Sequence, residues 1–296
     1  MTESTLVDRL APGDHVCWTV DDDAELTRVL GGYVRGGVAA DHKVVYLAHA
    51  RTPEETADEL RAEGLDVDAL VAASALEIHE GEPLYLAGGS FDPDRMIAQC
   101  EELCTQARAE GFSGVRLAGD MGWAARPVAG GDRLVEYEAA VTRVYAEGFA
   151  IGLCLYDRRL FHPAVLARLS AAHPAGARPG DRDDWHPQLR LHRDGDGSRL
   201  MVSGEADVAN GDALIALLDA VRTGADGAPA VLDVGHLDFV DVRSVRALVA
   251  TAARLGGLHI VGASPLLRRL LDFVGAAAVP GLVVHPREDV LPVAGS

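Results

Sequence analysis

The amino-acid sequence predicts an α/β protein of two domains, on three observations. Apolar, strand-length runs alternate with helix-length segments along the whole 296-residue chain, which is the pattern of largely parallel sheets covered by helices. The chain is also longer than one typical domain. A stretch rich in proline, glycine and charge, residues 173–188, interrupts the hydrophobic pattern. We therefore predict one domain at residues 1–174, a linker at 175–188 and a second domain at 189–296.

The elements of the first half follow from their flanking residues. Three aspartates, residues 21–23, precede the first helix and complement the positive end of its dipole. Pro53 opens the second helix, because proline is tolerated in a first turn. The predicted strands are 43–48, 76–79, 114–118 and 149–156, and the predicted helices are 24–33, 53–63, 92–110, 132–147 and 163–172.

The second half alternates in the same way. A polar turn is predicted at residues 235–238, after the apolar run 230–233. Asp241 is then in position to cap a helix that starts at Val242. The predicted strands are 189–192, 200–203, 230–233, 259–262 and 282–284, and the predicted helices are 208–222, 242–255 and 265–274.

Composition excludes several classes of function. The formal net charge of −18 would repel a phosphate backbone, so we do not expect nucleic-acid binding, whereas a partner with a positive surface is plausible. No apolar run reaches the roughly 18 residues that span a bilayer, and the N-terminus lacks the features of a signal peptide. We expect a cytoplasmic protein without membrane contact. The four cysteines are interpreted as core residues.

Four clusters of polar and aromatic residues stand out in the first half. They are Gly-Asp-His-Val-Cys-Trp at 13–18, the run 114–123, Glu-Tyr-Glu at 136–138, and 153–157 with the later His173-Pro174. Their order, spacing and types resemble the MEDS domain over residues 10–174. MEDS is the sensory domain of methanogen and methylotroph regulators, among them a dichloromethane-responsive repressor. The resemblance implies a sensor related to RecA-like ATPases.

A RecA-like ATPase needs a glycine-rich loop with lysine before its first helix, so that backbone amides hold the phosphates. The equivalent segment here, residues 17–25, has no glycine and no lysine and carries three aspartates that repel a triphosphate. No serine or cysteine is recognisably paired with both a base and an orienting acid. We therefore expect a degenerate RecA-like domain with no catalytic residues, and a protein that is not an enzyme.

The pocket at the carboxyl ends of the strands is the expected ligand site. His15 and Cys17 point the same way in an extended segment and suit a soft metal or haem iron, or else are a core cysteine and a histidine bonded to backbone. Arg116, within an apolar strand, either holds a polar ligand or forms a structural ion pair with Asp120 or Glu138. The sequence assigns no metal site and leaves the cofactor unknown. The candidate ligand-binding residues are His15, Cys17, Trp18, Arg116, Asp120, Trp123, Glu138 and Tyr156.

The second half resembles the STAS domain, the anti-sigma-factor-antagonist module, over residues 189–288. The resemblance rests on Gly204 to Asp207, the segment 230–249, and Ala263-Ser264-Pro265. In that family a serine follows the aspartate and is phosphorylated by a partner kinase. Here the residue is Val242, which has no hydroxyl, and Ser244 points elsewhere on the helix. The docking residues that the resemblance implies are Asp238, Asp241, Val242, Arg243, Ser244 and Arg246, with Asp241, Arg243, Ser244 and Arg246 expected to be exposed.

The fold class is thus a degenerate RecA-like parallel-sheet domain followed by a STAS α/β domain. We expect a regulator that senses a small ligand through the first domain and docks an anti-sigma factor or switch kinase through the second. Both kinds of module often self-associate, so a homo-oligomer is possible. Two alternatives remain open: a degenerate RecA-like protein that still binds a nucleotide, and a metal or haem redox sensor that uses His15 and Cys17.

Overall fold

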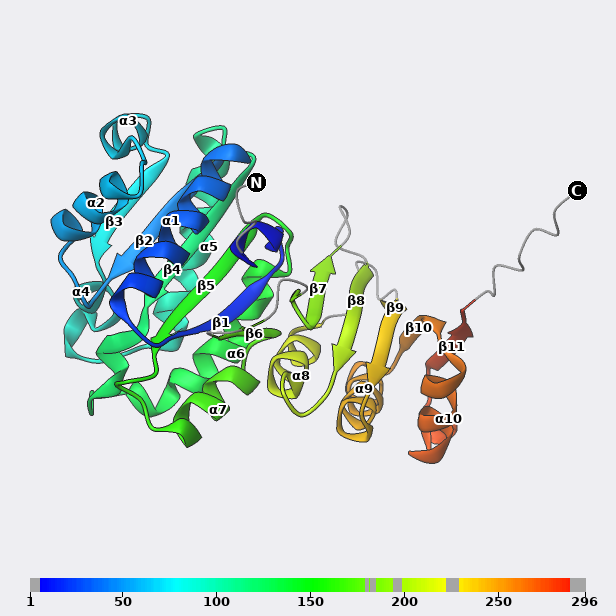
Figure 1. Ribbon diagram of the computed structural model, residues 1–296. Helices are drawn as coiled ribbons and strands as arrows, with labels where there is room; N and C mark the ends of the chain where they lie inside the picture. Colours follow the sequence, from blue (N-terminus) through cyan, green and yellow to red (C-terminus); the bar gives the residue numbers. More distant parts are fainter. Residues whose placement is uncertain (1–5, 179–180, 182–184, 194–198, 222–228, 288–296) are drawn as a thin grey trace, which may run out of the picture.

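The computed structural model describes residues 6–178, 181, 185–193, 199–221 and 229–287. Two sheets follow one another along the chain, each with its own helices (Figure 1). Parts of three predictions lie outside the described residues: linker residues 179–180 and 182–184, Arg222 at the end of a predicted helix, and residues 288–296 of the second domain.

The N-terminal domain is built on a six-stranded sheet with the order β3-β2-β4-β5-β1-β6, in which every neighbouring pair is parallel. This sheet confirms the α/β class that the alternating pattern predicted. The strands are β1 His15–Val20, β2 His42–Ala48, β3 Leu76–Glu80, β4 Gly114–Asp120, β5 Ala150–Asp157 and β6 Ala175–Ala177.

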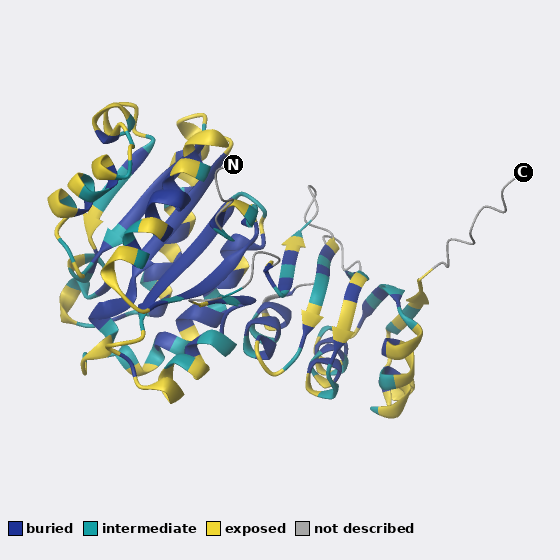
Figure 2. Ribbon diagram, in the orientation of Figure 1, coloured by how far each residue is buried: buried dark blue, intermediate teal, exposed yellow. Residues whose placement is uncertain are grey.

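Helices cover both faces of this sheet, so its central strands are buried along their length (Figure 2). Val16, Trp18 and Val20 of β1 pack with the first group of helices, whereas Cys17 packs with the second. The first group is α1 Asp23–Ala39, α2 Pro53–Ala62 and α3 Val67–Ala72, and the second is α4 Gly81–Tyr85, α5 Pro93–Ala109, α6 Leu134–Tyr145 and α7 Pro163–Ala171.

The C-terminal domain has a five-stranded sheet in the order β11-β10-β9-β8-β7, in which only β7 is antiparallel to its neighbour. Alternate residues of its strands, such as Leu200 and Val202 of β8, pack with all three helices in one apolar core. The elements are β7 Leu189–Arg193, β8 Arg199–Ala206, α8 Gly211–Ala220, β9 Ala230–Val240, α9 Val242–Leu255, β10 Leu258–Ala263, α10 Pro265–Phe273 and β11 Leu282–Pro286.

Several boundaries differ from the prediction, and three of them change the architecture. The turn predicted at residues 235–238 is wrong, because β9 continues to Val240 and pairs with β8 across two register shifts. Helix α1 runs six residues beyond Tyr33. Gly36 and Gly37 have no side chains there, which leaves room for the side chains of Arg116 and Val44 to pack against the helix. Residues 175–177, assigned to the linker, form β6 on the edge of the first sheet.

The two domains contact each other through strand β7 and helices α6 and α8 (Figure 1). Arg190 of β7 forms an ion pair with the buried Asp14, with 2.8 Å between Nε and Oδ1. Ala146, which follows α6, is fully buried in the core of the C-terminal domain, and its carbonyl accepts a hydrogen bond from the Arg193 amide. Among the described residues, no helix has both the length and the apolar character needed to span a bilayer.

Candidate functional site

Four buried polar side chains meet in the N-terminal domain: His15, Glu138, Cys154 and His173. One ligand atom from each lies within 4.8 Å of all the others. Two imidazoles, a carboxylate and a thiol are costly to bury unless they are paired or bound, so their convergence marks a candidate site. We call these four residues the buried quartet.

The parallel sheet brings the quartet together from four separate segments. His15 starts β1, and Cys154 lies in the neighbouring strand β5, where it pairs with Cys17. Glu138 projects from α6, which covers this face, and His173 follows the last turn of α7. Residue 152 opposite His15 is a glycine, and any Cβ there would lie 2.8 Å from the His15 ring. The site therefore depends on the strand register and on a missing side chain.

Glu138 is the hub of the contacts. Its Oε2 lies 3.5 Å from His15 Nε2, 3.3 Å from His173 Nε2 and 3.4 Å from Cys154 Sγ. Its Oε1 accepts a hydrogen bond from the Tyr156 hydroxyl at 2.5 Å. The Cys154 Sγ is also 3.5 Å from His15 Nε2.

The outer nitrogens of both imidazoles are fixed by other groups. His15 Nδ1 is 3.0 Å from the Thr142 hydroxyl, and His173 Nδ1 is 2.8 Å from the Leu169 carbonyl oxygen. Tyr145 stacks on the His15 ring at 4.7 Å between centroids. Both Nε2 atoms are consequently aimed at Glu138, although the 3.3 Å contact of His173 Nε2 lacks good hydrogen-bond geometry.

The buried surroundings shift the pKa of three residues in the quartet. Desolvation, followed by repulsion from His173, lowers the pKa of His15 to about 4, so the imidazole is neutral at pH 7. Desolvation, with Glu138 nearby, raises the pKa of the Cys154 thiol well above its ordinary value. Burial alone would raise the pKa of Glu138, but His173 and His15 outweigh it and lower that pKa, so a carboxylate stands in the core.

An apolar cavity of about 280 Å³ adjoins the quartet and lies between the sheet and α5. Cys154 belongs to both the quartet and the cavity wall, and Tyr145 contacts both. The volume is just below the usual range of about 300–1,000 Å³ for ligand sites in proteins. The wall is mostly apolar but includes four polar residues, and its members include Val45, Leu47, Leu84, Tyr85, Met96, Cys100, Leu103, Leu117, Tyr137 and Leu153 with His79, Gln99, Glu102 and Gln106.

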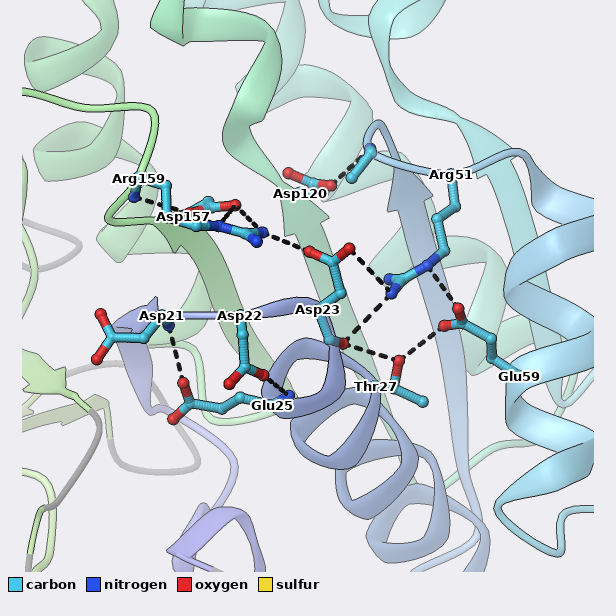
Figure 3. Close-up of polar contacts among 11 residues, drawn as sticks. Asp21, Asp22, Asp23, Glu25, Thr27, Arg51, Glu59, Asp120, Asp157 and Arg159 are labelled. Carbon is cyan, nitrogen blue, oxygen red and sulfur yellow. Dashed lines mark hydrogen bonds and ion pairs between the residues drawn. The ribbon is translucent and has the colours of Figure 1, made fainter.

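The carboxyl edge of the sheet has a different character (Figure 3). Asp22 caps α1 by accepting a hydrogen bond from the Glu25 amide, and the Glu25 carboxylate accepts one from the Asp21 amide. The positive end of this helix is therefore occupied by the protein's own carboxylates, where a nucleotide-binding loop would hold phosphate.

Arginines of the chain neutralise the remaining acids at this edge. Arg159 bridges Asp157 and Asp23, and Arg51 bridges Asp23 and Glu59 (Figure 3). Because these ion pairs are internal, the edge offers no surplus of positive charge to a triphosphate.

The predicted ligand-binding residues do not form one site. His15, Glu138 and Tyr156 are brought together, and Cys17 is adjacent in the sheet. Trp18 and Trp123 are core residues: Trp18 packs on the α1 face, and Trp123, fully buried, stacks on Tyr85. Asp120 accepts hydrogen bonds from the amides of Ala50 and Gly122 at the strand end.

The ion pair expected of Arg116 with Asp120 or Glu138 is not what the structure contains. Arg116 lies on the α1 face, opposite α6, where it donates to the Tyr33 carbonyl oxygen at 3.0 Å and stands over the Tyr33 ring. A strand alternates its side chains between faces, so the residue could not reach Glu138.

Two residues of the quartet, Cys154 and His173, were not assigned to a site from the sequence. Both fall in the clusters that carried the MEDS resemblance, which was the available signal. His173 precedes Pro174 at the start of a stretch that the sequence analysis assigned to a break between domains, and that position concealed its burial.

In the C-terminal domain the predicted docking residues surround the start of α9. Asp241 caps the helix through the Ser244 amide, as the sequence predicted. Asp238, Arg243 and Arg246 are exposed, and Arg243 pairs with Asp212. Ser244 was expected to be exposed, but it is 1% exposed because it faces the sheet one turn into the helix. Asp241 was also expected to be exposed, but it is half-buried, as is Val242.

Comparison with known proteins follows the same division of the chain. Residues 14–174 match the family described as the "MEthanogen/methylotroph, DcmR Sensory domain", MEDS, and residues 189–284 match the "Mlab, STAS domain". No curated protein sequence matches the chain.

Solved structures similar to the chain include flagellar accessory protein FlaH from Methanocaldococcus jannaschii, at 13% identity and a TM-score of 0.43, covering 72% of this chain and 88% of FlaH. A KaiC-like protein from Pyrococcus horikoshii matches at 12% identity and a TM-score of 0.41, covering 62% of this chain and 74% of its own. The MEDS match spans more than half of the sequence. The chain therefore belongs to the MEDS family and carries a STAS domain after its sensory domain, which makes it a signalling protein.

Proposed function

We propose that this protein is a non-catalytic cytoplasmic regulator whose N-terminal domain binds a small apolar molecule and whose C-terminal domain docks a protein partner. The observation that carries the proposal is the cavity of about 280 Å³ between the sheet and α5. Its wall is largely aliphatic and aromatic, which favours a compact hydrocarbon or halogenated hydrocarbon over a charged metabolite. The sensory family to which the chain belongs supports this assignment.

Helix α6 offers a direct route from the cavity to the second domain. Tyr137 and Tyr145 of this helix line the cavity. Immediately after the helix, Ala146 is buried in the second core and bonds β7 through the Arg193 amide. A ligand that shifts α6 must therefore repack part of the second domain.

Two further contacts adjoin residues of the quartet. Asp14, beside His15, pairs with Arg190 of β7, and the Pro174 carbonyl, beside His173, accepts a hydrogen bond from Asn210 at 3.4 Å. Asn210 precedes α8, which in turn packs on α9. The start of α9 is thus connected to the sensory domain through α8.

Hydrogen exchange on the full chain tests both halves of this proposal. Dichloromethane, n-butanol or benzene, added at saturation, is expected to raise the Tm and to slow exchange in α5 and α6. The hydrogen-exchange rates at the starts of α8 and of α9 are expected to change as well, because α6 contacts α8. Unchanged exchange throughout with all three probes would contradict ligand sensing, whereas protection confined to α5 and α6 would contradict transmission.

The docking surface is proposed at the start of α9, with an anti-sigma factor or switch kinase as the partner. Val242 stands directly after the capping aspartate and has no hydroxyl to phosphorylate, so control would come from the sensory domain. The exposed cation Arg246 lies on α9, and the exposed Arg268 lies on α10. In a two-hybrid screen against such partners, Arg246→Glu should weaken binding at least tenfold and Arg268→Glu should not. Equal effects of the two variants would argue against this surface.

Nucleotide binding is the alternative, and the carboxylates at the start of α1 disfavour it. We expect ATP with Mg²⁺ to leave the Tm of the protein unchanged, because no free helix terminus or surplus cation receives the phosphates there. A saturable increase in Tm would reopen this alternative.

A further inference from the structure

Four of the six distances within the buried quartet equal the spacing of metal ligands. Among His15 Nε2, Glu138 Oε2, Cys154 Sγ and His173 Nε2 these four are 3.3, 3.4, 3.5 and 3.5 Å, and the other two, from His173 to His15 and to Cys154, are within 4.8 Å. Nitrogen and oxygen at about 2.0–2.1 Å and sulfur at about 2.3 Å from one tetrahedral zinc ion lie about 3.3–3.6 Å apart. The four distances match four edges of that tetrahedron.

A cluster held by hydrogen bonds alone accounts for the geometry less well. Hydrogen bonds between nitrogen and oxygen centre on about 2.9 Å, whereas both imidazoles stand 3.3 Å or more from Glu138 Oε2. His173 is 0% exposed, and its Nε2 lies 3.3 Å from Glu138 Oε2 without a well-directed hydrogen bond. A buried nitrogen with so weak a contact is costly unless something else binds it.

The surrounding groups are those that hold metal ligands in place. Metal-binding histidines usually bond their second nitrogen to a hydroxyl, carboxylate or carbonyl group, which fixes the ring. Thr142 does this for His15 and the Leu169 carbonyl does it for His173. The Tyr156 hydroxyl holds the second oxygen of Glu138 in the same way.

We propose that His15, Glu138, Cys154 and His173 bind one divalent transition-metal ion, with zinc as the best match. Two imidazole nitrogens, a thiolate and a carboxylate suit a borderline-soft, tetrahedral ion and not magnesium or calcium, which prefer oxygen ligands. All four positions of the tetrahedron come from the protein, as in structural zinc sites. The ion would join β1, β5, α6 and the segment that follows α7, next to the domain contacts of Asp14 and Pro174.

This assignment differs from the one that the sequence suggested. His15 is a ligand in both, but its sulfur partner is Cys154, not Cys17. Cys17 pairs with Cys154 across β1 and β5, and both cysteines are buried. The two cysteines therefore form a matched pair for the test.

The test uses the purified full chain, stripped with a chelator and titrated with Co²⁺ and then Zn²⁺. One Co²⁺ per chain should give the thiolate-to-cobalt absorption band and the strong visible bands of tetrahedral cobalt, and Zn²⁺ should abolish both. Cys154→Ser should lose the thiolate band, whereas Cys17→Ser should keep it. Thr142→Val should keep the band but weaken Zn²⁺ affinity by about 10–100-fold, because the hydroxyl positions a ligand without binding the metal.

Three outcomes would overturn the proposal: no stoichiometric metal in the wild-type chain, a cobalt spectrum without a thiolate band, or loss of the band in Cys17→Ser with its retention in Cys154→Ser. The cobalt spectrum of the wild-type chain tests the proposal even if a variant fails to fold. The metal site does not depend on the proposed ligand. A Leu103 variant that fills the cavity should therefore leave the cobalt spectrum intact.

Discussion

The Leu103→Trp variant is expected to lose binding of the small apolar probes while it remains folded. Leu103 lies on α5, is half-buried and lines the cavity, so an indole at this position occupies the space of the ligand. Overfilling a packed site costs about 1–3 kcal/mol, which corresponds to roughly 5–150-fold weaker binding. Calorimetric titration with benzene or n-butanol measures the change.

Ala98→Trp provides the matched control, because Ala98 is exposed on the same helix and does not contribute to the cavity wall. It adds the same side chain to α5 but should leave the affinity within about twofold. If both variants bind the probes as tightly as the wild type, the ligand does not occupy this cavity. The Tm of the wild-type chain then separates the two explanations. If only the cavity is wrong, the probes still shift the Tm, whereas no Tm shift means that the sensory function is wrong.

The second large effect is expected from Trp123→Ala. Trp123 is 0% exposed and packs against Tyr85 at 4.9 Å and Phe91 at 5.0 Å between ring centroids. Removing a buried aromatic side chain of this size costs about 3–5 kcal/mol. Urea unfolding followed by circular dichroism should show this loss in the transition of the N-terminal domain, and the C-terminal transition should be largely unchanged.

Trp123→Phe keeps an aromatic ring in the same place and should lose less than half as much stability. From the sequence, Trp123 is a candidate ligand-binding residue. A residue with that role alone would change ligand affinity and leave the free energy of unfolding nearly unchanged. That result would support the sequence-based interpretation and contradict the core position.

The sequence was sufficient for the arrangement of elements wherever the local pattern and the tertiary packing agree. The runs around Val115 and Ile151 are apolar because both faces of a parallel strand are covered, and they were predicted as strands. The aspartate before α9 was predicted as its cap from residue type and position alone. The double family assignment likewise followed from motifs that are contiguous in sequence.

Long-range contacts decided the features that the sequence missed. Helix α1 continues through Gly36 and Gly37, where the Arg116 side chain fills the space beside both glycines. Strand β9 continues through a predicted turn because β8 supplies hydrogen-bond partners. Arg116 and β8 are both distant in sequence from the segments they contact, so no local pattern predicted these outcomes.

The same distinction applies to the candidate site. Residue types in short motifs determined by themselves that this chain has a MEDS domain followed by a STAS domain, and they named His15 and Glu138 as candidate ligand-binding residues. Only the tertiary structure decided that Cys154, which is 139 positions beyond His15, and His173 complete the quartet, and that Arg116 faces the other way. The physical reason is that strand register and the alternation of side chains across a sheet fix which groups meet, and both are set by pairing between distant segments.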